Sequence, residues 1–209
     1  ERARSQELDL VIHAGDVFDH ESTRADRTTV RRAVDRTVSA GTPFCYIHGN
    51  HDNDAGKRAL AKSNGIHLEP NPTHFDDLAI NLLGVDHAGS SFPEIPPSST
   101  PNLSQYPTLL VIHEKSYPVV DETGSPIYDR DGPIADISEF VLEASSYGID
   151  YIISGHQHLA ERGMVRGLRT DVVVTGSPAT LRRPKPDNPF STWEWSVTTA
   201  NCNLSRHPM

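Results

Sequence analysis

Cysteines and long hydrophobic runs are scarce in this sequence. Two of the 209 residues are cysteines, Cys45 and Cys202, which argues against a disulfide scaffold or a thiolate zinc site and favours a reducing compartment. No apolar run approaches the roughly 20 residues that span a bilayer, and the longest ones, such as residues 8–12 and 109–112, have the length of buried strands. We therefore expect a globular protein of the cytoplasm without a membrane partner.

Positive charge is also in short supply. Lysine and arginine together number 19 against 28 aspartates and glutamates, which gives a net charge of −9. This balance speaks against nucleic-acid binding through bulk charge, because phosphates are normally neutralised by lysine and arginine. It leaves open a local site at which metal ions supply the positive charge.

Buried strands alternate with amphipathic helices in the first half of the chain, and the second half contains more strand–turn–strand patterns. The pattern predicts helices at residues 24–40, 55–63 and 137–146, strands at 8–14, 43–47, 66–68, 78–85, 109–112, 149–153 and 192–197, a hairpin at 165–168 and 170–175, and long loops at 86–107 and 114–133. This arrangement is typical of an α/β sandwich. We expect one domain over residues 1–197, followed by a tail without regular structure over 198–209.

A short polar cluster follows each of four predicted strands. The clusters are GDVFD at residues 15–19, GNHD at 49–52, HE at 113–114 and GHQH at 155–158. Because the carboxyl ends of strands in an open α/β sheet meet at one edge, we expect these side chains to lie close together. Aspartate, asparagine and histidine form a mixed oxygen and nitrogen ligand set that suits Mn, Fe or Zn better than Ca.

Each residue alone also has an ordinary structural explanation. Asp16 could cap the helix that begins near Arg24, although Asp19 or Ser22 could do so as well. An asparagine at a turn, a histidine at the end of a buried strand and a surface pair of histidines are all common. The four clusters taken together, in this order and context, favour a single metal centre.

These motifs resemble the calcineurin-like metallophosphoesterase family, in which GDVFD, GNHD, a lone histidine after a strand and GHQH stand in the same order. The resemblance covers residues 8–178. Within the family, the chain is most similar to the SbcD-type DNA repair nucleases. The similarity lies in the segment LDLVIHAGDVFD, in the spacing from this segment to GNHD, and in TGSPATLRR at 175–183. It implies a four-layer α/β/β/α sandwich and metal-dependent phosphodiester hydrolysis by a DNA exonuclease or endonuclease. It also implies an ATPase partner of the SbcC type, and it allows a homodimer.

The resemblance implies a role for each residue of the clusters. Asp16 would bridge two divalent ions, Mn foremost with Fe or Zn as alternatives. The second ion would be bound by Asn50, His113 and His156, and the first ion by His158. His51 would be the catalytic acid that protonates the leaving oxygen, and Asp52 would orient either His51 or a backbone turn.

The sequence departs from the family pattern at two places. The opening Asp-x-His motif of the family does not precede Asp16, so we expect the chain to begin after that strand, as an N-terminally truncated domain. Asp19 stands where some of these nucleases have a second catalytic histidine. Two other functions therefore stay open, a small-molecule phosphodiesterase or phosphatase and a noncatalytic metal-binding or interaction domain.

Overall fold

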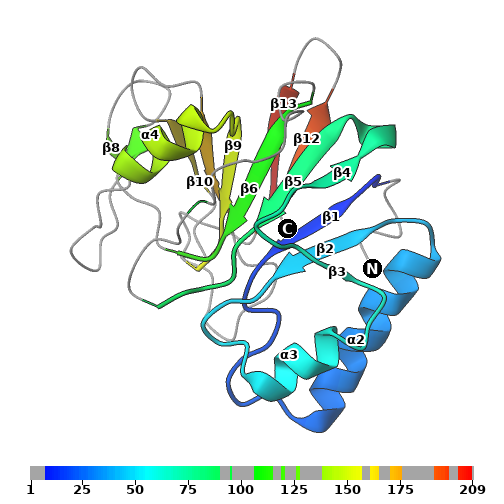
Figure 1. Cartoon of the computed structure of the whole chain (residues 1–209). Helices are drawn as coiled ribbons and strands as arrows, with labels where there is room; N and C mark the ends of the chain where they lie inside the picture. Colours follow the sequence, from blue (N-terminus) through cyan, green and yellow to red (C-terminus); the bar gives the residue numbers. More distant parts are fainter. Residues whose placement is uncertain are drawn as a thin grey trace.

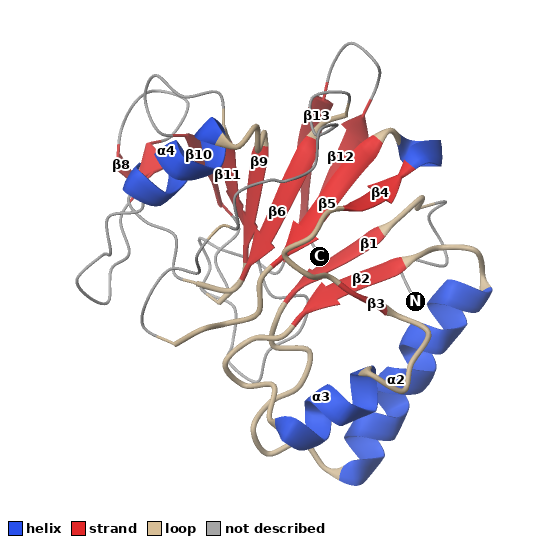
Figure 2. Cartoon of the chain, in the orientation of Figure 1, coloured by secondary structure: helices blue, strands red, loops and turns tan. Residues whose placement is uncertain are grey.

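The computed structural model describes residues 8–89, 95, 106–114, 119–120, 126–127, 138–156, 161–164, 170–175, 191–197 and 202–208. These residues form two main sheets and a separate hairpin. Figure 1 shows how the elements are arranged, and Figure 2 distinguishes helices from strands.

The smaller sheet is parallel and contains the first three described strands. Its order is β1 (Val11–Ala14), β2 (Phe44–Ile47) and β3 (Ile66–His67). Two helices, α2 (Arg24–Ser39) and α3 (Asp54–Leu60), cover its outer face (Figure 1). The layer between these helices and the sheet is an apolar cluster of Phe18, Val34, Tyr46 and Leu60.

The larger sheet is mixed and has eight strands. Its order is β4 (Thr73–Phe75), β5 (Ile80–Gly84), β6 (Thr108–Ile112), β9 (Tyr151–Ser154), β11 (Asp171–Val174), β10 (Glu161–Met164), β7 (Val119–Val120) and β8 (Pro126–Ile127). The four central strands β5, β6, β9 and β11 run parallel, whereas β4 and β10 pair antiparallel with their neighbours. Helix α4 (Ser138–Ser146) packs on one face of this sheet.

The two sheets share a core because successive residues of a strand face opposite sides. On β6, Leu109 and Val111 pack against the smaller sheet, while Leu110 and Ile112 pack beneath α4. Cys45 of β2 lies in the core between the sheets, and burial raises the pKa of its thiol to about 12. The layers therefore run helix, sheet, sheet, helix, which confirms the predicted α/β/β/α sandwich.

The long helix α2 lies where its apolar spacing predicted it. Its N-cap is Thr23, whose hydroxyl accepts a hydrogen bond from the Asp26 N–H. The cap is thus none of the residues that the sequence left possible, and capping does not explain Asp16. Gly41 follows the helix with a φ of 96°, as expected for a glycine that ends a helix.

Several short strands were not predicted. The segment 114–133 was expected to be a loop but contains β7 and β8, and β4 precedes β5 where no strand was expected. Strands of two or three residues are too short to show an alternating pattern, and their pairing depends on neighbours that are distant in sequence. The predicted first strand of the hairpin, residues 165–168, lies outside the described residues, and the described strand that pairs antiparallel with β11 is β10, Glu161–Met164.

Part of the segment expected to be a tail, residues 198–209, forms a strand. Residues Cys202–Pro208 form β13, which pairs antiparallel with β12 (Ser191–Val197) along seven residue pairs. The sequence of β13 is mostly polar, so cross-strand pairing rather than hydrophobic alternation produces it. Among the described helices, none combines the length and the apolar character needed to cross a membrane.

Candidate metal centre

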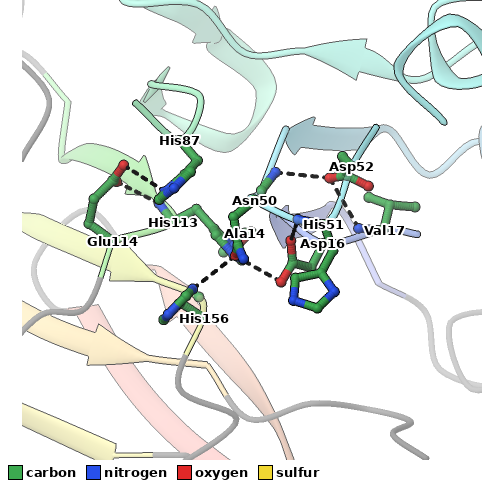
Figure 3. Close-up of polar contacts among 12 residues, drawn as sticks. Ala14, Asp16, Val17, Asn50, His51, Asp52, His87, His113, Glu114 and His156 are labelled. Atoms are coloured by element: carbon green, nitrogen blue, oxygen red, sulfur yellow. Dashed lines mark hydrogen bonds and ion pairs between the residues drawn. The ribbon is translucent and has the colours of Figure 1, made fainter. Parts of the chain in front are cut away.

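Four of the six predicted site residues converge at the strand ends between the two sheets. The Nε2 atom of His113 lies 3.0 Å from Oδ2 of Asp16 and 3.0 Å from Oδ1 of Asn50. The same Asn50 oxygen lies 3.0 Å from Nδ1 of His156 (Figure 3). Three loops and the end of β6, far apart in sequence, thus bring two oxygen and two nitrogen donors to one point.

The backbone at this point is in an uncommon conformation. Asp16 and His156 have φ angles of 55° and 71°, in the left-handed region that residues with a side chain rarely occupy. Gly15, with a φ of 83°, adopts the same region without a steric cost. Each non-glycine residue costs on the order of 1 kcal/mol here, and such strain concentrates at functional sites.

Gly49 and Gly155 are needed for space rather than for an unusual backbone conformation. Their φ angles are not among the positive ones, but a Cβ on either residue would meet neighbouring atoms. A Cβ on Gly49 would lie 2.7 Å from Nε2 of His113, and one on Gly155 would lie 2.9 Å from Nδ1 of the same ring. The two glycines therefore let the backbone approach His113 from both sides.

His113 is held in one orientation by its other ring nitrogen. Nδ1 donates a hydrogen bond to the carbonyl oxygen of Ala14 at 2.6 Å, so Nε2 faces Asp16 and Asn50. Burial lowers the pKa of His113, but the hydrogen bonds with Asp16 and with Ala14 outweigh it, and the pKa is raised overall. For Asp16, burial acts in the opposite direction and raises the pKa. The hydrogen bonds from His113 and from the His51 N–H outweigh burial and bring the pKa of Asp16 below its ordinary value.

This donor set fits a divalent metal ion. The ligand atoms of Asp16, His113 and His156 all lie within 4.8 Å of one another. A metal-binding histidine usually donates the N–H of one ring nitrogen to a backbone carbonyl, a carboxylate or water, and its other nitrogen binds the metal ion. The Nδ1 of His113 has such a carbonyl partner. A cation at this point would replace the contact between Nε2 of His113 and Oδ2 of Asp16.

His51 lies at the exposed edge of the centre. Its backbone N–H donates to Oδ1 of Asp16 at 2.8 Å, and its ring nitrogen Nδ1 lies 3.2 Å from Oδ1 of Asp19. The ring stacks on His20 with a centroid separation of 4.1 Å. The hydrogen bond with His51 is the main cause of the lowered pKa of Asp19.

Asp52 binds the backbone rather than His51. Its carboxylate accepts hydrogen bonds from the N–H groups of Val17, Phe18 and Gly49 at 3.3, 2.8 and 2.9 Å, and the residue is 3% exposed. It therefore joins the loop after β1 to the loop after β2. Of the two roles that the resemblance implied for Asp52, the geometry matches the orientation of a backbone turn.

His87, which the sequence motifs did not single out, lies against the same centre. Its ring is 5.9 Å from that of His113 and 6.3 Å from that of His156, and its Nδ1 lies 3.2 Å from Oε1 of the buried Glu114 (Figure 3). Glu114 also accepts a hydrogen bond from the Ala88 N–H at 3.1 Å. His87 follows strand β5, so the rule that singled out polar residues after buried strands could have found it.

His158, the predicted ligand of the first metal ion, lies outside the described residues. The described residues thus contain all four predicted ligands of the second ion. Of the predicted ligands of the first ion, they contain only Asp16.

Comparisons with known proteins agree with this fold. Residues 1–160 match the sequence profile of the calcineurin-like phosphoesterase family. The crystal structure of TT1561 of Thermus thermophilus matches with a TM-score of 0.56 and 15% identity, over 84% of this chain and 80% of that one. No curated protein matches the sequence.

A second solved structure, from Staphylococcus aureus, is described as a putative 5′-nucleotidase in complex with alpha-ketoglutarate. It matches with a TM-score of 0.50 and 18% identity, over 87% of this chain but only 39% of that protein. At these identities the two structures show the fold alone, whereas the family profile covers most of the chain and includes Asp16, Asn50, His113 and His156. The chain therefore belongs to the calcineurin-like phosphoesterase family, whose members hydrolyse phosphoester bonds with divalent metal ions.

Proposed function

We propose that this protein hydrolyses phosphodiester bonds in DNA, with two divalent ions, Mn foremost, as its cofactors. The observation that carries the proposal is the convergence of Asp16, Asn50, His113 and His156, with His51 beside them at an exposed edge. The assignment of DNA as the substrate rests further on the similarity of the first two motifs to those of SbcD-type nucleases.

The residues of the centre have separable roles in this proposal. Bound divalent ions supply positive charge against the phosphoryl oxygens and lower the pKa of water, which is the usual contribution of metals to such reactions. Asp16, Asn50, His113 and His156 would hold one ion, and Asp16 and His158 would take part in holding the other. Asp52 keeps the loops that carry Asp16 and Asn50 in register through its three backbone hydrogen bonds.

His51 is proposed as the general acid. The contact between Nδ1 and Asp19, together with the stacking on His20, fixes the ring plane and leaves Nε2 to protonate the departing oxygen. Asp19 stands where some related nucleases have a second histidine, and here it contacts the first one. We therefore assign Asp19 the role of orienting His51.

The exposure of the edge supports a large substrate. The side chains of His51 and Asp19 are 41% and 59% exposed. Sites for small molecules usually enclose most of their ligand, whereas a polymer needs contact with only one phosphodiester group at a time. The negative net charge is compatible with DNA because the metal ions provide the local positive charge.

The test is hydrolysis of three substrates by the full-length protein with Mn²⁺, namely labelled duplex DNA, bis(p-nitrophenyl) phosphate and a nucleoside 5′-monophosphate. We expect Mn²⁺-dependent shortening of the DNA and cleavage of the diester. His51→Ala should lower the rate about 100-fold or more. His74→Ala, a control at an exposed histidine of β4, should retain the wild-type rate.

Two results would overturn the proposal. Release of phosphate from the monophosphate while DNA stays intact would indicate a small-molecule phosphatase, the class to which the Staphylococcus aureus protein is assigned by its description. Absence of hydrolysis of all three substrates by a folded, Mn²⁺-loaded chain would indicate a noncatalytic domain.

The remaining parts of the proposal concern partners and location. We propose an ATPase partner of the SbcC type and action in the cytoplasm, and a homodimer is compatible with both. Co-purification of the chain with such a subunit, and sedimentation of the chain alone, test these points directly.

A further inference from the structure

A second cluster of metal-ligand side chains lies behind the loop that carries Asn50. It consists of His48, His67 and Asp86, whose ligand atoms all lie within 4.8 Å of one another. The rings of His48 and His67 have a centroid separation of 4.7 Å, and Nε2 of His67 lies 2.8 Å from Oδ1 of Asp86. Three different strand ends contribute these residues, those of β2, β3 and β5.

The state of His48 is not explained by ordinary packing. The residue is 7% exposed, and the described part of the chain offers no hydrogen-bond partner to its buried Nδ1 atom. Among the described residues, this nitrogen is therefore not engaged in a hydrogen bond and is available to a cation within the cluster.

The other two residues form an ion pair that a metal ion can replace. The hydrogen bond with Asp86 raises the pKa of His67, while burial raises the pKa of Asp86 and the contacts with His67 and the His48 N–H bring it below its ordinary value. Both side chains are 35% exposed, so a cation can reach them from solvent. An ion pair accounts for these two residues, but it does not account for the buried imidazole of His48 beside them.

We propose that His48, His67 and Asp86 bind a zinc ion that is separate from the catalytic centre. Two imidazoles and one carboxylate are a common ligand set for Zn²⁺, and the exposed side of the cluster leaves room for water as a further ligand. Lys57 and Glu69 are the other charged side chains that act on His67, and their opposite charges offset each other. This proposal does not depend on the proposed function.

The location indicates what the zinc ion does. The His48 N–H donates to Oδ1 of Asp86 at 2.8 Å, and the His87 N–H donates to the His48 carbonyl at 2.9 Å. In the loop after β2, His48 belongs to the zinc cluster and Asn50 faces the catalytic centre. In the loop after β5, Asp86 belongs to the zinc cluster and His87 lies against the catalytic centre. A zinc ion here fastens both loops to β3 and so stabilises the positions of catalytic side chains that it does not touch.

The first test is zinc content after equilibrium dialysis of the full chain against Zn²⁺. His67→Gln and Asp86→Asn should each bind one zinc ion fewer per chain than the wild type. The control His74→Gln should bind as many as the wild type, because His74 contacts Asn81 and lies outside both clusters. Asp86→Asn keeps an oxygen acceptor for the His48 N–H, so its loop retains that hydrogen bond.

A second measurement uses the wild-type chain and therefore does not depend on how the variants fold. Titration with Zn²⁺ followed by ¹⁵N NMR of the histidine rings should shift the ring nitrogens of His48 and His67 and leave those of His74 unchanged. Unchanged His48 and His67 signals, or equal zinc content in all folded variants, would overturn the proposal and would mean that zinc binds only at the catalytic centre.

Discussion

At the scale of single residues, the centre depends on glycines, which have no Cβ, as well as on the side chains of the ligands. Gly49 lies where a Cβ would come within 2.7 Å of Nε2 of His113 and would also collide with Asp16. Gly41, in contrast, has a positive φ of 96°, but a Cβ added to it would meet no atom within 4 Å. Alanine substitutions at these two glycines therefore separate the effect of a steric collision at the centre from the effect of backbone strain.

Gly49→Ala should displace His113 or Asp16 and weaken Mn²⁺ binding by about 10- to 100-fold, the range found when the support of metal ligands is disturbed. Gly41→Ala should lower the free energy of unfolding by about 1 kcal/mol, because alanine is strained at a positive φ, and should bind Mn²⁺ as the wild type does. Calorimetric titration and urea unfolding of both variants measure these effects. Equal Mn²⁺ affinity in the two variants would contradict the role assigned to Gly49.

The residue types and their position after strands were enough to predict most of the centre. Asp16 and Asn50 follow parallel strands of the smaller sheet, His113 and His156 follow parallel strands of the larger sheet, and the carboxyl ends of both pairs meet between the sheets. The sequence pattern predicted the meeting of these residues, but it did not show that two sheets contribute to it. The partner of His51 could not be predicted, because the contact with Asp19 depends on the course of two loops that are 32 residues apart in sequence.

At the scale of secondary-structure elements, α2 is specified by its own sequence. Thr23 and Asp26 form a reciprocal capping box, in which the Asp26 carboxylate accepts from the Thr23 N–H at 2.8 Å and the Asp26 N–H donates to the Thr23 hydroxyl. The hydrogen bond from the Thr23 side chain is the main cause of the lowered pKa of Asp26. The strands β7, β8 and β13 have no such local signal, which is why the sequence did not predict them.

The capping box predicts a pH dependence of stability. A folded-state pKa below the ordinary value stabilises the fold above the ordinary aspartate range, and this stabilisation is lost as the pH falls through the folded-state pKa. Asp26→Asn should therefore be less stable than the wild type at neutral pH, and the difference should shrink as the medium becomes acidic. Urea unfolding at a series of pH values measures it, with Thr23→Ser as a control that keeps both hydrogen-bonding groups. A difference that stays constant with pH would contradict this role of the carboxylate.

At the scale of the whole molecule, the fold depends on the core that joins the two sheets. Leu82 of β5 is fully buried in that core together with Ile47 and Val111, whereas Leu142 of α4 is 58% exposed. Leu82→Ala should lower the free energy of unfolding by about 2–5 kcal/mol, and Leu142→Ala should change it by less than about 0.5 kcal/mol. Chemical denaturation compares them, and a similar loss in both variants would contradict the layer assignment.

The metal centre at the strand ends of the two sheets is the feature on which the proposed activity depends. The most direct test is an anomalous difference map from crystals of the full chain grown or soaked with Mn²⁺. We predict a peak within bonding distance of Oδ2 of Asp16, Oδ1 of Asn50, Nε2 of His113 and Nδ1 of His156. A map in which ordered manganese lies elsewhere, or in which no peak contacts these four atoms, would contradict the existence of this centre.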